Sequence, residues 1–171
     1  MGILPDNAKT SGAFSVQVST GGVVSNAVWA PAAAASPGIY SQNGSGYDQA
    51  YIVNSDGTLN SPANPAAMGS AITIFATGVG TYTLVNGYTV TALPPTIYIG
   101  GFYANGIAAV SGPVDGLPGN VFQISVYVPD PAKFADINPA LKDFHFPPRV
   151  SVRMGMGTLP QSQVGLYLSV K

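Results

Sequence analysis

Short runs of alternating apolar and polar residues recur along this 171-residue chain, and turn residues end nearly every run. The clearest run is 71–77, where β-branched and aromatic side chains alternate until the strand stops at Gly78-Val79-Gly80. A period of two is typical of a strand that buries one face, and Gly, Pro, Asn and Asp are the residues of tight turns. Because such runs follow one another at intervals of about ten residues, the pattern predicts an all-β protein. The expected strands are 13–18, 23–30, 71–77, 81–91 with a turn at 86–87, 96–99, 103–110, 121–128, 150–154 and 164–170.

Charged side chains are scarce and exclude several classes of partner. They make up only 8% of the chain, which contains no glutamate, against roughly 25% in an average domain. The net charge is −1 and no run of Lys or Arg exists, so the chain has no basic patch to attract phosphate backbones or anionic lipids. We expect neither nucleic-acid binding nor membrane insertion, since no apolar stretch approaches ~18 residues. The lack of cysteine excludes disulfides and thiolate metal sites.

The chain is expected to fold as two parts. Residues 1–34 form an N-terminal hairpin segment with its turn at Gly21-Gly22, and residues 35–171 form an antiparallel β-sandwich. The whole chain has thirteen charged side chains, six basic and seven acidic. Within the second part, residues 129–148 carry five of them, together with five prolines. A long connection of this kind is usually functional or covers a sheet edge.

A weak internal repeat suggests a role for the hairpin. Residues 15–28 and 151–164 both read as strand, glycine turn, strand. The hairpin is then either the last hairpin of a preceding repeat unit or an arm that adds its strands to an open sheet. In the second case its apolar side chains are assembly residues, namely Phe14, Val16, Val18 and Trp29.

A series of short motifs resembles a known family. In order, they are 35–40 (ASPGIY), 54–60 (NSDGTLN), 64–66 (NPA), 74–80 (IFATGVG), 99–101 (IGG) and 119–129 with the core FQISVYVP. Together they resemble the C-terminal domain of unknown function that recurs in large exported proteins of Solibacter and other Acidobacteria. The resemblance covers about residue 35 to the end. It implies a secreted or cell-surface β-sandwich of immunoglobulin-like, IPT/TIG style without assigned activity, whose export signal lies outside this chain. Segment 129–148 is longer and more charged than the family pattern.

No catalytic constellation is evident. His145 is the only histidine, and as a general base or metal ligand it would need partners such as Asp143. Gly78-Val79-Gly80 imitates a dinucleotide fingerprint but lacks the third glycine and the following helix. We therefore expect a protein that is not an enzyme, with a hydrolase carried by His145 and Asp143 as the least favoured alternative.

Two turns offer oxygen ligands. Asn54 and Asp56 of one turn, together with Asp48, would form a calcium site if the turns fold together, because calcium takes six to eight oxygens. Asn43 and Asn60 would add further oxygen ligands. The alternative is that these residues serve turn geometry alone. No other cofactor is predicted.

Aromatic residues offer a second kind of ligand site. Tyr47 and Tyr51 flank a polar hairpin tip, and flat rings of this kind stack on sugars, with His145 of segment 129–148 as a further contact. The alternative is that most aromatics of a sandwich are core residues.

These observations predict a non-catalytic extracellular β-sandwich with a structural or adhesive role. It would associate with itself, or with neighbouring domains of a larger exported protein, by β-strand addition. The alternative function is a module that binds glycan or another cell-surface polymer.

Overall fold

The computed structural model describes the chain except for residues 1–10, 87, 105–108, 118–119 and 159–160. It confirms that the protein is all-β: the described residues form five separate sheets and no helix longer than four residues. Across these residues, no helix has the length and apolar character needed to span a membrane.

The first large sheet has five strands in the order β12-β11-β15-β16-β6. β15 is the longest strand and pairs antiparallel with β11 on one side and with β16 on the other. β6, at the far edge, runs parallel to β16. The strands are β6 (Asp48–Gln49), β11 (Pro95–Ile99), β12 (Phe102–Tyr103), β15 (Arg149–Met156) and β16 (Leu166–Ser169).

The second large sheet is built on β8, the strand whose alternation is clearest in the sequence. One edge of β8 pairs with β14, which pairs in turn with β13, and the other edge is shared by β5 and β7. All of these pairings are antiparallel. The strands are β5 (Gly38–Ile39), β7 (Ile52–Asn54), β8 (Ala71–Thr77), β13 (Ala109–Ser111) and β14 (Phe122–Tyr127).

One hydrophobic core joins the two large sheets. β8 contributes alternate residues such as Ile72 and Ile74, and β11 and β15 contribute alternate residues such as Ile97 and Val152. Because side chains of a strand point alternately to its two faces, each sheet buries one face and leaves the other outside. Among the described residues, the core cluster begins at Ala35. We call residues 35–171 the body.

Two expected strands differ from the structure. Residues 103–110 were expected as one strand, but β12 and β13 belong to different large sheets, so that prediction is wrong. Residues 23–30 form two strands rather than one, β3 (Val23–Val24) and β4 (Val28–Pro31). The pairing register shifts by one residue between them, which places an extra residue on the return strand, as in a β-bulge.

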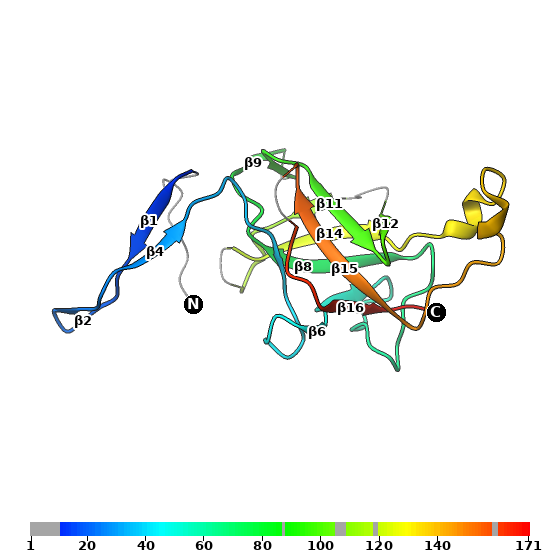
Figure 1. Cartoon of the computed structure of the whole chain (residues 1–171), viewed down its shortest axis with the longest axis horizontal. Coiled ribbons are helices and arrows are strands. Elements are labelled where there is room, and N and C mark those ends of the chain that lie inside the picture. Colours follow the sequence, from blue (N-terminus) through cyan, green and yellow to red (C-terminus); the bar gives the residue numbers. More distant parts are fainter. Residues whose placement is uncertain (1–10, 87, 105–108, 118–119, 159–160) are drawn as a thin grey trace.

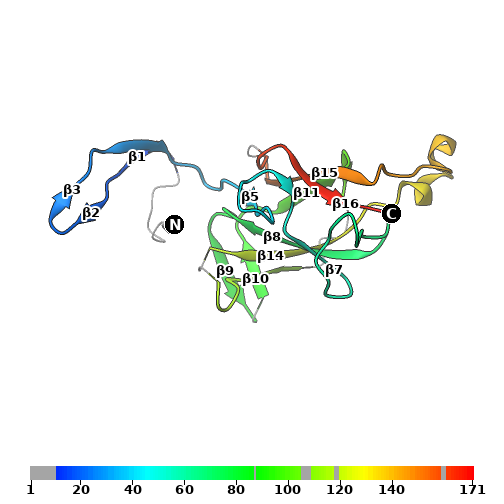
Figure 2. The same cartoon turned by 90° about the horizontal axis from the view of Figure 1, so that it is seen from below.

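The N-terminal hairpin is confirmed, and it stands apart from the body (Figures 1 and 2). β1 (Ala13–Val16) pairs with β4, and β2 (Ser19–Thr20) pairs with β3 around the Gly21-Gly22 turn. Both turn glycines have positive φ, which only glycine adopts without cost. We call residues 13–31 the arm.

The connection from arm to body crosses the two glycines that follow β8. The Ser36 N–H donates to the Gly78 carbonyl oxygen at 3.0 Å. A Cβ on Gly78 would overlap the Ser36 carbonyl oxygen, and a Cβ on Gly80 would overlap that of Ala34. Gly78 and Gly80 therefore let two backbones approach closely, which explains a motif that resembles a nucleotide loop only in its letters.

One edge of each large sheet is covered by the body's own chain. On β5, the Gln163 side chain donates to the Ile39 carbonyl at 2.6 Å and accepts from the Ile39 N–H at 3.3 Å. The outer edge of β7 is paired with residues 58–60, and that of β6 with residues 41–42. By contrast, β1 has no strand partner other than β4 within the described part of the chain.

Segment 129–148 lies at the pole of the body opposite the arm (Figure 1). It contains two 3-10 helices, η1 (Pro131–Phe134) and η2 (Pro139–Leu141). Its end packs on β12, where the rings of Phe144 and Phe146 meet Phe102 with centroids 5.3 and 5.6 Å away. This end of the segment therefore covers part of a sheet edge.

A further hairpin is formed by β9 (Tyr82–Val85) and β10 (Tyr88–Thr91). Tyr82 packs edge-on against Phe122, with ring centroids 5.2 Å apart, and the Thr89 hydroxyl donates to the Gly112 carbonyl at 2.7 Å. One face of the hairpin is thus fixed to the body.

Candidate functional site

The register of the arm sorts its side chains onto two faces. Phe14 lies opposite Ala30, and Val16 lies opposite Val28. Directly paired residues share a face, and so do residues two apart, so these four side chains form one uninterrupted apolar strip. Trp29 lies on the other face, opposite Ser15.

This strip has little cover from the rest of the protein. Phe14 and Ala30 are half-buried, whereas Val16 and Val28 are exposed. Towards the tip, Val18 and Val23 are also exposed, and Trp29 is 71% exposed. Apolar surface gathered in this way usually marks an interaction site.

The arm also lacks the charges that normally keep sheet edges apart. Not one charged residue occurs between Lys9 and Asp48. Natural edge strands are commonly protected by lysine, proline or bulges, and the arm carries only the bulge and Pro31 at its base. A two-stranded ribbon is at best marginally stable alone, so the arm would gain stability from any partner that packed on it.

The opposite pole carries a second exposed apolar group. On segment 129–148, Ile137 is 85% exposed and Phe134 is 50% exposed. Figures 1 and 2 place this segment and the arm at opposite ends of the body. The chain therefore presents apolar surface at both poles.

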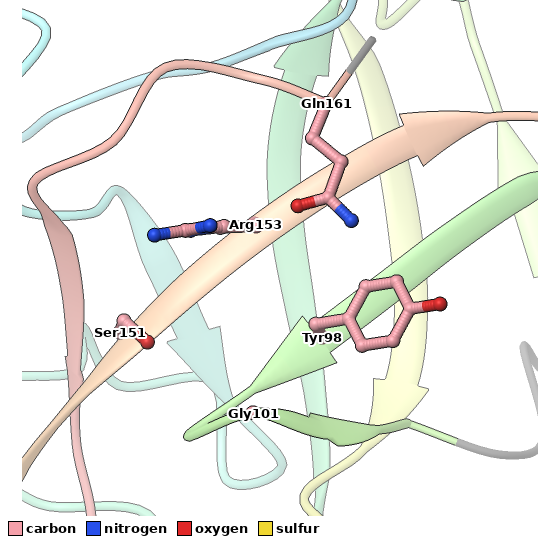
Figure 3. Close-up of a pocket in the computed structure, with 5 residues that line it drawn as sticks. All are labelled: Tyr98, Gly101, Ser151, Arg153 and Gln161. Atoms are coloured by element: carbon pink, nitrogen blue, oxygen red, sulfur yellow. The ribbon is translucent and has the colours of Figure 1, made fainter. Parts of the chain in front are cut away.

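A cavity of about 310 Å³ lies on the outer face of the first large sheet (Figure 3). Tyr98 comes from β11, Ser151 and Arg153 come from β15, and Gln161 comes from the loop that follows β15. Tyr98 and Arg153 are direct cross-strand partners, so their side chains leave the sheet side by side. Gly101 completes the lining.

The tyrosines proposed from the sequence do not form one surface. Tyr51 packs edge-on against Phe75 of β8, with ring centroids 5.1 Å apart, whereas Tyr47 packs against Gly165 just before β16. Both are exposed, but they lie over different sheets. His145 is exposed between two packed phenylalanines in segment 129–148.

The oxygen ligands proposed for calcium have partners within the protein. Asp48 forms an ion pair with Arg149, and the Asn54 side chain donates to the Asn64 carbonyl at 3.0 Å. Asp56 accepts from the Thr58 N–H at 3.0 Å and from its hydroxyl at 2.5 Å. Within the described ranges, no group of three or more histidine or acidic side chains is arranged to hold a metal. The contacts match the turn alternative rather than an open cation site.

The Asp56 turn gives a testable pH effect. The Thr58 hydroxyl, and then the Thr58 N–H, stabilise the carboxylate and hold the pKa of Asp56 below its ordinary value of 3.8. A lowered pKa means that the stabilisation is present above pH 3.8 and is lost as the pH falls through the folded-state pKa. In Thr58→Val we expect the Asp56 carboxyl to titrate closer to its ordinary value, measured by carbon NMR. An unchanged midpoint would exclude the hydroxyl as the main cause.

The structure also reveals a buried polar centre around Asn60, a role that differs from the calcium ligand proposed from the sequence. Asn60 is fully buried, and its amide donates to the Asn54 side-chain oxygen at 3.1 Å and to the Ser169 carbonyl at 2.9 Å. Its side-chain oxygen accepts from the Ser169 N–H at 2.9 Å and from the Gln49 amide at 2.7 Å. Asn60 therefore ties the turn after β7 to β6 and β16. In the sequence, Asn60 was noted only as the end of the NSDGTLN motif and as a further oxygen ligand for calcium.

Comparison of the chain with protein-family models, with curated proteins and with solved structures finds no match. The resemblance to the acidobacterial C-terminal domain thus stands on its motifs alone.

Proposed function

We propose that this protein is a non-catalytic structural or adhesive module of immunoglobulin-like style that acts at the cell surface and associates with itself through its arm. The observation that carries the proposal is the uncharged arm, which projects from the body with an exposed apolar strip and, within the described residues, no strand partner outside the arm. The extracellular location rests on the family resemblance.

The partner is a second copy of this chain. The Gln163 side chain covers the edge of β5, and residues 41–42 and 58–60 cover those of β6 and β7. β12 and β13 end the two large sheets on their other sides but stay within the body, whereas the arm projects from it and is therefore the segment best suited to strand addition or face packing. Ile137 and Phe134, at the opposite pole, offer apolar surface for the arm of the next copy. Contacts between unlike surfaces at opposite poles propagate head to tail instead of closing a dimer.

The single tryptophan allows a test of which faces of the arm a partner covers. Trp29 is largely exposed in the isolated chain and lies on the face of the arm opposite the strip. A shift of its emission to shorter wavelength as the protein concentration rises would show that association covers this second face as well. In the full chain carrying Val16→Ser and Val28→Ser, we expect association at least about tenfold weaker, because two apolar contacts are lost.

The matched control carries Val85→Ser and Val90→Ser on the β9–β10 hairpin. These two valines have similar exposure but lie on the body. Equal weakening in both variants, measured by light scattering over a concentration series, would contradict the proposal.

A further inference from the structure

We propose that the outer face of β11 and β15 binds a carboxylate-bearing sugar, such as a uronate unit of an acidic polysaccharide. This site is independent of the arm. Its cavity, of about 310 Å³, is at the lower end of the size range of ligand pockets (Figure 3).

Arg153 supplies the charge recognition. Within the described part of the chain, no carboxylate lies within ion-pair distance of Arg153, whereas Arg149, on the same face of β15, pairs with Asp48 and stacks 4.0 Å above the Tyr167 ring. A guanidinium presents its N–H donors in a planar fork that matches a carboxylate in two parallel hydrogen bonds. A free arginine beside a cavity therefore favours an anionic group.

Aromatic rings supply the apolar part of the site. The Tyr98 ring lies beside the Tyr103 ring of β12, with centroids 5.7 Å apart, and Tyr103 is 44% exposed. The C–H face of a pyranose ring is apolar and packs on such rings, while a tyrosine also keeps a polar tip for solvent or ligand. Tyr98 lines the cavity and is the direct cross-strand partner of Arg153, so one sugar unit can contact both side chains.

The remaining polar groups suit sugar hydroxyls. Ser151 offers a hydroxyl that both donates and accepts, and the Gln161 side-chain amide offers two donors and an acceptor. In Figure 3 both side chains flank Arg153 on the same side of the sheet. A neutral sugar offers the guanidinium only hydroxyl oxygens, whereas a sugar acid offers a carboxylate and the stronger charged hydrogen bonds, so the lining favours a sugar acid.

The test uses the full chain and calorimetric titration with oligomers of galacturonate, guluronate and glucuronate. Neutral glucose oligomers and dextran sulfate serve as comparison ligands. We expect a uronate oligomer to bind and the neutral oligomers not to bind. Loss of the charged hydrogen bonds in Arg153→Gln should weaken binding about 10- to 100-fold. The control Lys142→Gln removes the same charge from segment 129–148 and should leave affinity unchanged.

The aromatic contribution is tested separately. Tyr98→Phe keeps the ring and should retain most of the affinity for uronate, whereas Tyr98→Ala should lose that affinity. The control Tyr88→Ala removes an exposed ring from another part of the body and should leave the affinity unchanged. Thermal unfolding of each variant shows whether the fold is intact. The Val16→Ser and Val28→Ser variant should bind uronate normally, which separates this site from arm-mediated association. Failure of all three uronates to bind, tighter binding of dextran sulfate, or equal losses in Arg153→Gln and Lys142→Gln would overturn the proposal.

Discussion

Gly78→Ala should cost about 2–5 kcal/mol of unfolding free energy, because left-handed backbone is unfavourable for alanine and the new methyl group overlaps a fixed backbone. Gly78 has a φ of +71°, and its missing Cβ leaves room for the Ser36 carbonyl oxygen. Ser36 lies on the segment that connects the arm to the body, and it cannot move without breaking its hydrogen bond to Gly78. Urea unfolding followed by circular dichroism measures the loss.

Gly101→Ala is the matched control for the glycine prediction. Gly101 also has a positive φ, of +85°, but a Cβ there meets no atom within 4 Å. It should therefore show only the conformational cost, about 1–2 kcal/mol. A loss for Gly78→Ala no larger than that for Gly101→Ala would refute the close-approach explanation.

Asn60→Ala should destabilise the protein by about 3–5 kcal/mol, since each buried polar group left without a partner costs about 1–3 kcal/mol. The truncation removes the side-chain oxygen that accepts from the Ser169 N–H and the Gln49 amide, and it removes one of the two donors to the Ser169 carbonyl, the other being the Ala66 N–H. Alanine is too small to fill the space that the amide leaves. Denaturant unfolding and hydrogen exchange at β16 should both report the loss.

An exposed asparagine provides the comparison for Asn60. Asn43 accepts only from Ser45 in the polar hairpin tip, so Asn43→Ala should change stability much less. If Asn60→Ala proves as mild as Asn43→Ala, Asn60 is not the centre that joins β6, β7 and β16.

Long strands were predictable because their sequence reflects burial directly. The alternation at residues 71–77 places Ile72, Ile74 and Ala76 in the core, as a period of two requires. The Gly21-Gly22 turn was equally visible, since two residues with positive φ point to glycine. Local geometry and a single buried face are the properties that a sequence expresses most clearly.

Features that depend on distant contacts could not be predicted. Gln163 closes the edge of Ile39 across 124 residues, and Asn60 meets Ser169 across 109. Each looks in the sequence like an ordinary polar residue of a turn or loop. The cavity likewise depends on Tyr98 and Arg153 being paired across two strands, which only the register between β11 and β15 establishes.

The arm lies between these two cases. Its apolar residues Phe14, Val16, Val18 and Trp29 were proposed for assembly from the sequence, and the structure adds that Val16 and Val28 share one exposed strip. The alternation of apolar residues along each strand is visible in the sequence, but the strip also depends on the register between β1 and β4, which only the structure gives. Its partner stays a prediction.

The most direct test is the solution mass of the intact chain and of a version lacking residues 1–30, measured by light scattering over a concentration series. The shortened chain keeps every described residue of the core cluster, which begins at Ala35. We predict that the mass of the intact chain rises steadily with concentration beyond that of a dimer, while the shortened chain is a folded monomer. An intact chain that stays monomeric at every concentration would contradict a structural module that associates through its arm.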